Sequence, residues 1–281
     1  MSHLAMGLRG VNCYIFAGGN RCGSYGVTTD VYDYHACIGA NGEKRPTLRV
    51  LRNFFRLMNR NTWLCEADRV STVRVGIDCA QLAREQNPAH PDSGYRHRLQ
   101  HGLMYTLAMT AYPSRYTDLG NPPPADQPLL IYHAGQFSRA AQENAVRFVR
   151  EGGKLLLIGG ALAAGEPLAD LIGATVIPNQ SHACRVQFEN RQLHCIQSQY
   201  QITATQPGDT VILTDEAKQY KYGIRGSREK GSFIYLCADW NTTILEQRDL
   251  LTELLSAAGA EPVLSCSNPA VCWTVRRWGQ Q

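Results

Sequence analysis

The chain has 281 residues, which is enough to bury a sizeable core and is more typical of two domains than of one. Apolar residues at 44% and charged residues at 19% exclude a disordered or fibrous protein. The net charge of +4 comes mostly from scattered arginine, and no apolar run approaches the ~18 residues of a membrane span. We therefore expect neither nucleic acid nor a membrane as a partner.

The start of the chain and its cysteines indicate a compartment. The opening sequence MSHLAMGLRGVN lacks the basic head and the apolar stretch of a secretory signal. The 10 cysteines include no CxxC pair, and no common zinc spacing occurs among them. We expect free thiols in a cytoplasmic protein, with no metal site and no cofactor.

The segment from Gly10 to Gly19 alternates as a β-strand does, with Asn12 and Tyr14 on the same face. That mixture of polar and aromatic groups fits a half-exposed strand and a strand lining a binding site equally well. Farther on, apolar residues at helical spacing predict a helix from Thr47 to Asn59. Strand, long loop and helix form one βα module, which cannot close a barrel by itself.

Two motifs in this region resemble the last βα unit of the catalytic barrel in glycoside hydrolase family 35 β-galactosidases: GVNCYIFAGGNRCGSYG and DVYDYHACIGANGEKRPTLRVLRNF. The family carries G-x-N-x-Y-x-F-x-G-G-T-N-x-G, then YDY-x-A-P-[IL]-x-E-x-G. The match covers roughly residues 5 to 60. It departs from the family at Arg21 and Cys22, at Cys37 in place of a proline, and at Ala40 in place of an acidic residue.

The resemblance implies a galactose subsite lined by Tyr14 and Tyr34, with Asn12 and Asp33 close by as supporting polar groups. A tyrosine suits this task because it offers an apolar ring face to a sugar and a hydroxyl to the sugar's rim. Ordinary packing is the alternative for each tyrosine taken alone. The implied ligand is galactose or a β-galactoside.

The same resemblance implies that the catalytic residues are elsewhere. A retaining glycosidase needs two carboxylates about 5–5.5 Å apart. In the family they come from earlier barrel strands, which would lie before Met1. The acids near the loop are Asp30, Asp33 and Glu43, and none stands in a matching catalytic motif. We therefore predict no catalytic residue in this chain.

From Ser71 onward the pattern is that of a doubly wound α/β domain. Short strands and helices alternate, beginning with a strand over Val73–Ile77 and a helix over Tyr95–Met109. Two continuous apolar runs, Leu129–Tyr132 and Leu155–Ile158, are typical of parallel strands buried on both faces.

Between these two runs the sequence predicts a capped helix. Ser138 can cap it, and Gly152 and Gly153 end it because the left-handed turn at a helix C-terminus suits glycine. Another helix is expected at Pro167–Ile172.

This flavodoxin-like domain resembles the class I glutamine-amidotransferase-like domain that follows the barrel in some β-galactosidases of families 35 and 42. There it is known as a trimerisation region, which implies a homo-oligomer. True amidotransferases carry a cysteine nucleophile on the turn after the strand equivalent to Leu155–Ile158. Here the turn reads Gly159-Gly160-Ala161, without a thiol, so amide transfer is not predicted.

The C-terminal third combines strands with one long helix. Residues 182 to 235 alternate around polar turns, which predicts an antiparallel insertion, and Phe233–Cys237 returns to the main sheet. Thr243 and Glu246 form a capping box for a last helix, which Gly259 ends.

Three domain ranges follow. Residues 1–68 hold the last strand, loop and helix of a (β/α)8 barrel, residues 69–262 the amidotransferase-like domain, and residues 263–281 a tail that begins a further β domain. The first hypothesis is part of a β-galactosidase that carries part of the galactose subsite without either carboxylate and is inactive alone. The alternative is a non-catalytic amidotransferase-like module for binding or oligomerisation.

Overall fold

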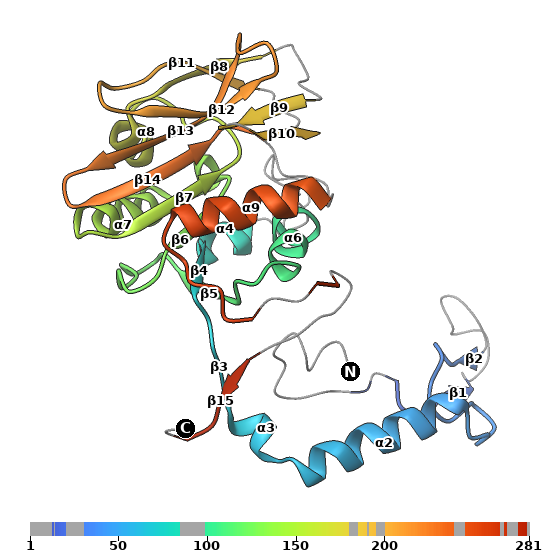
Figure 1. Cartoon of the computed structure of the whole chain (residues 1–281). Helices are drawn as coiled ribbons and strands as arrows, with labels where there is room; N and C mark the ends of the chain where they lie inside the picture. The colour runs from blue at the N-terminus through green and yellow to red at the C-terminus, as the bar shows by residue number, and fades with distance from the viewer. Residues whose placement is uncertain are drawn as a thin grey trace. The chain divides into compact units, whose positions relative to one another are not determined.

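The structure is a computed structural model (Figure 1). It describes residues 13, 15–20, 31–84, 99–179, 185–189, 191–194, 200–238, 245–264, 267–268 and 275–279. The chain divides into two compact units: unit 1 combines Met1–Val70 with Cys272–Gln281, and unit 2 is Ser71–Val271. The predicted boundary lies two residues before this one. None of the helices in the described ranges combines the length and apolar character that a bilayer crossing would require.

The described residues of unit 1 form helix α2 (Pro46–Arg60), the short helix α3 (Trp63–Glu66) and two pairs of two-residue strands. The pairs are antiparallel: β1 (Gly19–Asn20) with β2 (Val31–Tyr32), and β3 (Asp68–Arg69) with β15 (Arg276–Arg277). Helix α2 confirms the helix predicted over Thr47–Asn59. It begins at a proline, whose missing N–H would have no partner at the first helical position anyway.

The strand predicted between Gly10 and Gly19 is found only in part among the described residues. Ile15 and Phe16 lie in a turn, whereas Ala17 forms a β-bridge with Ile38 and Gly19 begins β1. Ile38 exchanges backbone hydrogen bonds of 2.8 Å with Gly18 and 3.1 Å with Phe16. A strand continues only as far as a neighbouring strand supplies hydrogen bonds, so alternation alone did not extend it through Ile15 and Phe16. A complete barrel unit therefore stays a prediction.

Unit 2 is built on a nine-stranded mixed sheet with the order β10-β9-β12-β13-β14-β7-β6-β4-β5 (Figure 1). Its last five strands are parallel. Numbered along the chain, these five follow the order 2-1-3-4-5, which is the flavodoxin-like doubly wound order. They are β4 (Val73–Ile77), β5 (Ser114–Asp118), β6 (Leu129–Tyr132), β7 (Lys154–Ile158) and β14 (Gly231–Leu236).

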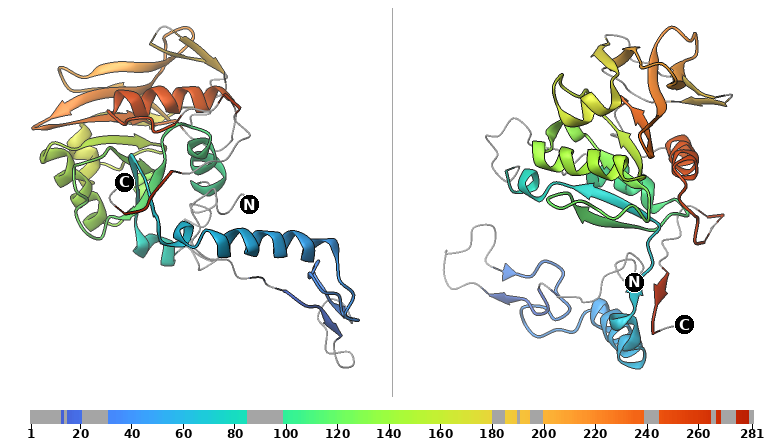
Figure 2. Two further views of the ribbon diagram at one scale, coloured as in Figure 1. Left: turned by 60° about the horizontal axis from the view of Figure 1, so that its bottom comes forward. Right: turned by 90° about the vertical axis from the view of Figure 1, so that its left-hand side faces the viewer.

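The two central strands confirm the apolar runs predicted from the sequence. All four side chains of β6 are fully buried, as are those of β7 after its first residue. Helices α7 (Arg139–Arg150) and α8 (Pro167–Ile172) pack together, and α6 (Tyr105–Ala108) packs against α9 (Leu245–Ala257) (Figures 1 and 2). The sheet is buried because helices cover it on both sides, as in doubly wound proteins.

The helix ends follow the predicted chemistry. The Ser138 hydroxyl accepts a hydrogen bond of 3.4 Å from the Ala141 N–H at the start of α7, and Gly152 takes the left-handed φ of 107° just after its end. Gly259 does the same after α9, with φ 76°. The proposed capping residue of α9, Thr243, lies outside the described residues.

The predicted helix over Tyr95–Met109 is described from Leu99 onward. The described part is π-helical over Leu99–Met104 and continues as α6, and Leu99, Leu103 and Leu107 are buried along it. The short helix α4 (Cys79–Arg84) follows β4.

The antiparallel strands require one correction. They were expected as an insertion apart from the main sheet, but four of them extend it by hydrogen bonding, because β13 pairs with β14. These four are β9 (Arg185–Phe188), β10 (Arg191–His194), β12 (Thr210–Asp215) and β13 (Lys221–Arg228). A separate ribbon pairs β8 (Thr175–Pro178) with β11 (Tyr200–Ala204).

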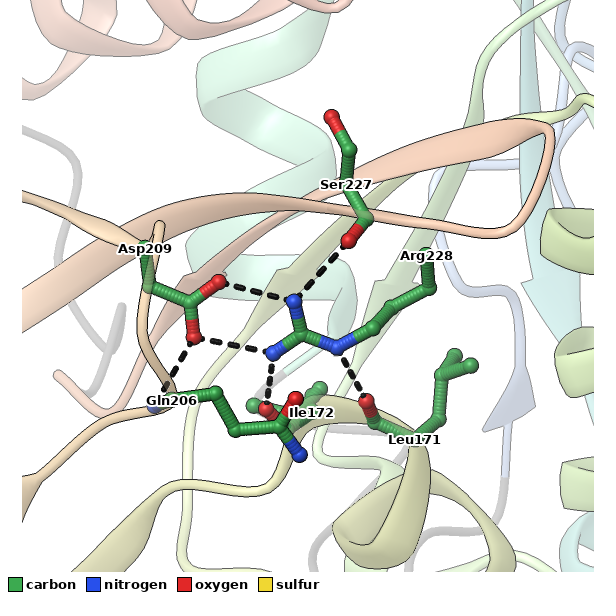
Figure 3. A network of polar contacts seen from close by, with 6 residues as sticks. All are labelled: Leu171, Ile172, Gln206, Asp209, Ser227 and Arg228. Carbon is green, nitrogen blue, oxygen red and sulfur yellow. Dashed lines mark hydrogen bonds and ion pairs between the residues drawn. The ribbon is translucent and has the colours of Figure 1, made fainter.

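A charged network fastens β13 to the end of α8 (Figure 3). The Arg228 guanidinium donates two hydrogen bonds of 2.8 Å to the two oxygens of Asp209, whose side chain is only 1% exposed. It also donates to the carbonyls of Leu171 (2.8 Å) and Ile172 (2.6 Å), and lies 4.8 Å from the centre of the Phe233 ring. The cation thus satisfies a buried carboxylate and the last carbonyls of a helix together.

We predict that Arg228→Met lowers the free energy of unfolding by roughly 3–5 kcal/mol, because it leaves the Asp209 carboxylate buried and unpaired. Arg228→Lys keeps the charge without the planar fork and should cost less, about 1–3 kcal/mol. Urea unfolding measures both changes. Arg150→Met is the control, since it removes an ion pair whose partners are 57% and 59% exposed; such a pair contributes about 0–1 kcal/mol. Equal losses for Arg228→Met and the control would contradict the assigned role.

Candidate functional site

The described part of the predicted sugar site lies on the loop between β2 and α2. Asp33 and Tyr34 directly follow β2. Tyr34 is 61% exposed, and its ring stands edge-on to that of Tyr32, with 4.9 Å between the ring centres. Within this chain, Tyr34 is therefore not part of a packed core. The other two predicted residues, Asn12 and Tyr14, lie outside the described residues, so their part in the site stays a prediction.

Tyr34 stands on a strained turn. Tyr34 and His35 have φ values of 35° and 61°, so two successive non-glycine residues occupy the left-handed region. Each such residue costs about 1–3 kcal/mol and persists only where its surroundings hold it. One hydrogen bond across the turn is local: the Ala36 N–H donates to the Asp33 carbonyl at 2.7 Å. Ala36 itself is buried and anchors the loop.

The stronger support comes from Arg45, the residue that caps the start of α2. Its guanidinium donates to both oxygens of the Asp33 carboxylate, at 2.6 Å to Oδ1 and through Nη2 to Oδ2. Nη2 also donates to Glu43 at 3.3 Å, and the Arg45 backbone N–H donates to the Cys37 carbonyl at 3.0 Å. Arg45 therefore connects the loop that carries Tyr34 to the N-terminus of helix α2.

Hydrogen bonds maintain the charges of Arg45 and of its neighbour Glu43. The hydrogen bond with Asp33, more than that with Glu43, raises the pKa of Arg45. The hydrogen bond from its own backbone N–H, followed by that from Arg45, lowers the pKa of Glu43. Because a lowered pKa keeps the carboxylate ionised to more acidic pH, the contact with Arg45 persists where an ordinary glutamate begins to protonate.

Sequence reasoning missed three residues of this arrangement. Tyr32 belongs to the same YDY motif as Tyr34, and the motif was the signal that could have included it. Arg45 and Glu43 had no such signal. Glu43 folds back over the turn, where its Oε2 accepts a hydrogen bond of 3.1 Å from the Asn41 N–H, and any Cβ on Gly39 would overlap its carboxylate.

Doubly wound proteins bind ligands at the carboxyl end of their parallel strands, where the strand order reverses. Unit 2 has such an end. Asp78 follows β4 there. Burial alone would raise the pKa of Asp78, but hydrogen bonds from Ser138, Gln81 and Ala80 lower it below the ordinary value. The strongest of these contacts is 2.6 Å, to the Ser138 N–H. This carboxylate is used to hold the starts of α4 and α7.

The turn after β7 is filled by a histidine. Gly159 and Gly160 have φ values of 89° and 75°. A Cβ on Gly159 would lie 2.9 Å from the His133 ring, and one on Gly160 would lie 3.0 Å from Nδ1 of the same ring. The Tyr235 hydroxyl donates to the Gly160 carbonyl at 2.8 Å. At Gly159 and Gly160 the His133 ring occupies the space that a side chain would need, and the next residue of the turn is Ala161. Within the described ranges, no group of three His, Cys, Asp or Glu residues could hold a metal ion.

Sequence comparison gives one partial relative. No protein-family model matches the chain. It is 28% identical over 167 residues to the exo-β-D-glucosaminidase of Thermococcus kodakarensis, a match that covers 54% of this chain and 21% of that enzyme.

Comparison of structures gives fuller matches. The fold is similar to that of Gan42B, a family 42 (GH42) β-galactosidase from G. stearothermophilus, in the structure of a catalytic mutant. The TM-score is 0.64 at 13% identity, over 89% of this chain and 38% of that one. A β-galactosidase from Bacillus circulans sp. alkalophilus gives a TM-score of 0.66 at 15% identity, over 93% and 41%.

The chain is similar to part of a glycoside hydrolase. It spans about two fifths of the length of these β-galactosidases and about a fifth of the glucosaminidase. Because the identities to the structures are low, they show a shared fold, a mixed α/β architecture. The structural match is to family 42, so the expected assignment to family 35 specifically is not supported.

For the turn after β7, we predict that Gly159→Ala destabilises the protein more than Gly165→Ala. The two glycines have similar φ values, 89° and 83°, but nothing lies within 4 Å of a Cβ on Gly165. Both substitutions incur the left-handed penalty of about 1–2 kcal/mol. The collision with His133 should add about 1–3 kcal/mol at Gly159 alone. Thermal and urea unfolding of both variants test this, and equal destabilisation would show that the histidine yields without cost.

For the loop that carries Tyr34, we predict that Arg45→Met speeds hydrogen exchange at the Ala36 amide about ten-fold, because the hydrogen bonds between the guanidinium and Asp33 are lost. Arg45→Lys should give a smaller increase because it keeps the charge but not the fork. Exchange followed by mass spectrometry on peptides covering residues 31–38 measures both. Arg49→Met, at an exposed position on α2, is the control. Unchanged exchange in Arg45→Met would mean that the turn is held by its backbone alone.

Proposed function

We propose that the chain is part of a β-galactosidase-type glycoside hydrolase of the family 35 and 42 kind, in which unit 1 supplies part of a saccharide-binding site. The single observation that carries this proposal is the exposed ring of Tyr34 on a left-handed turn held by Arg45 and Asp33. Strain of this kind is retained where function requires it. The exposed ring and hydroxyl suit the apolar face and the hydroxyl rim of a sugar.

The comparisons support the carbohydrate class. The neighbours in fold are β-galactosidases, and the sequence relative is an exo-β-D-glucosaminidase. The choice of galactose as the ligand comes from the two motifs around Tyr14 and Tyr34. Asp33 is a supporting group in this proposal, because both of its oxygens face Arg45.

The chain alone is proposed to bind rather than cleave. The acids described in unit 1 are Asp33, Glu43, Glu66 and Asp68. The first two share one arginine, and a carboxylate held in an ion pair is poorly suited to attack a sugar or to protonate a leaving group. The two catalytic carboxylates of a retaining mechanism would come from elsewhere in the complete enzyme.

Unit 2 is proposed as a scaffold and assembly module. Its turn after β7 reads Gly159-Gly160-Ala161, without a thiol, and the Asp78 carboxylate accepts hydrogen bonds at two helix starts. The homo-oligomer expected from the resemblance belongs to this part of the proposal.

To test the proposed binding, galactose and lactose can be titrated into the purified chain and followed by saturation-transfer NMR. We predict that Tyr34→Ala weakens binding about ten-fold, roughly 1.4 kcal/mol, because the stacking surface is lost. Tyr34→Phe should keep most of it. Tyr116→Ala, which removes a tyrosine that is 51% exposed on β5, is the matched control.

The same preparation can be assayed with a nitrophenyl β-galactoside, where we expect no turnover above background. Sustained hydrolysis that survives purification and inhibitor controls would overturn the binding-only role. Saccharide signals that are identical in Tyr34→Ala and the original chain would overturn the site.

A further inference from the structure

Helix α2 carries a row of arginines along one side: Arg49, Arg52, Arg56 and Arg60. Their spacing of three, four and four residues places them within an arc of about 80° on a helix of 3.6 residues per turn. All four are exposed. Helix α2 contains no Asp or Glu. Over the part of the chain that the structure describes, none of the four forms an ion pair with an acid.

Some arginines of unit 2 differ from those of the row because they have acidic partners. On unit 2, two exposed arginines lie beside acids: Arg139 is 3.0 Å from Glu143, and Arg150 is 3.0 Å from Glu229. On α2 the neighbours three and four residues away are other arginines, which repel one another and oppose the helix. An anion laid along the row would relieve that repulsion.

The charge of the two units is also unequal. Unit 1 contains 11 Lys and Arg against 5 Asp and Glu, a formal net charge of +6. Unit 2 contains 17 against 19, a formal net charge of −2. The positive charge of the chain is therefore concentrated in the smaller unit, and the arginine row is its largest continuous part. Such asymmetry raises the local concentration of an anionic ligand.

The geometry of the row fits an extended polymer. Eleven residues separate its ends, which at 1.5 Å per residue is about 16 Å, with roughly 5–6 Å between successive arginines. Each guanidinium matches a carboxylate or sulfate through two parallel hydrogen bonds. Asn53 and Asn59 flank the row on the helix wheel and can hydrogen-bond hydroxyl groups.

The same helix disfavours single-stranded nucleic acid as the occupant. Proteins that bind single strands place aromatic rings beside their cations for the bases to stack on. The aromatic residues of α2, Phe54 and Phe55, fall outside the arginine sector. The sector offers guanidinium and amide groups alone.

We propose that the arginine row of α2 binds anionic polysaccharide, through carboxylate or sulfate groups along one chain. The row is a surface separate from the loop that carries Tyr34. This inference rests on the proposed function in one respect: the proposed function is the reason for choosing a glycan among the linear polyanions.

The test uses the whole chain and its binding to polygalacturonate, measured by affinity electrophoresis and by fluorescence titration at low and physiological salt. In the variant with Arg49, Arg52, Arg56 and Arg60 all changed to Gln, we expect at least ten-fold weaker binding and a shallower salt dependence. Glutamine is chosen because it preserves helix propensity, and circular dichroism checks that the variant is folded. Changing the same four residues to Lys should give a smaller loss, because charge remains while the fork is lost.

The matched control removes four exposed cations from unit 2: Arg115, Arg147, Lys221 and Lys230, each changed to Gln. Its affinity should stay within two-fold of the original chain. An equal loss in this control would overturn the proposal in favour of a net-charge effect. Tighter α2-dependent binding to DNA than to polygalacturonate would overturn the glycan assignment.

The readout separates this inference from the proposed function. A neutral galactan, which lacks carboxylates, should not compete for the row. If galactose binding through Tyr34 fails while polygalacturonate still binds through α2, the saccharide subsite is wrong and the arginine row stands. If polygalacturonate binds equally well after the row is removed, the inference about α2 is wrong whatever Tyr34 does.

Discussion

The bidentate pair between Arg45 and Asp33 is the interaction on which the proposed saccharide site depends. Two consecutive left-handed residues, Tyr34 and His35, together cost an amount comparable to a large part of the stability of a small domain. A single backbone hydrogen bond contributes about 1 kcal/mol and cannot offset that cost. The pair with Arg45 adds charge-assisted hydrogen bonds to this one, and it ties the loop to the residue that immediately precedes Pro46 at the start of α2.

The two units use polar residues in opposite ways. In unit 2 the polar groups near the ends of the parallel strands are turned inward: Asp78 accepts backbone hydrogen bonds at two helix starts, and His133 fills the turn at Gly159. In unit 1 an aromatic ring is turned outward at considerable conformational cost. This contrast is why we assign ligand contact to unit 1 and a supporting role to unit 2, although the doubly wound topology would suggest a site at the strand ends.

An element could be predicted from the sequence where the residues that determine it lie close together in the chain. Strands β6 and β7 and helix α7 were predicted closely, because burial on both faces requires an unbroken apolar run and because Ser138 caps locally. Strand β5 was missed because an edge strand has one solvated side and reads as SRYTD, without an apolar run. Tyr34 was found through a motif. Arg45, which pairs with Asp33, was not, since an ion pair between residues 12 positions apart leaves no period in the sequence.

The arginines of this chain have two different roles. Some hold elements of the fold together, and others determine the surface charge. Arg228 and Arg74 are buried against Asp209 and Asp126, where the planar guanidinium meets both carboxylate oxygens and the charge is neutralised. Arginines of this kind hold elements together and add little to the field outside. Those on α2 have no acid on their own helix, so their charge extends into solvent and is screened only by salt. Four of the eleven cations of unit 1 lie on this helix face, and they are not used in packing. The face can therefore be altered by substitution while the Arg45–Asp33 pair is kept.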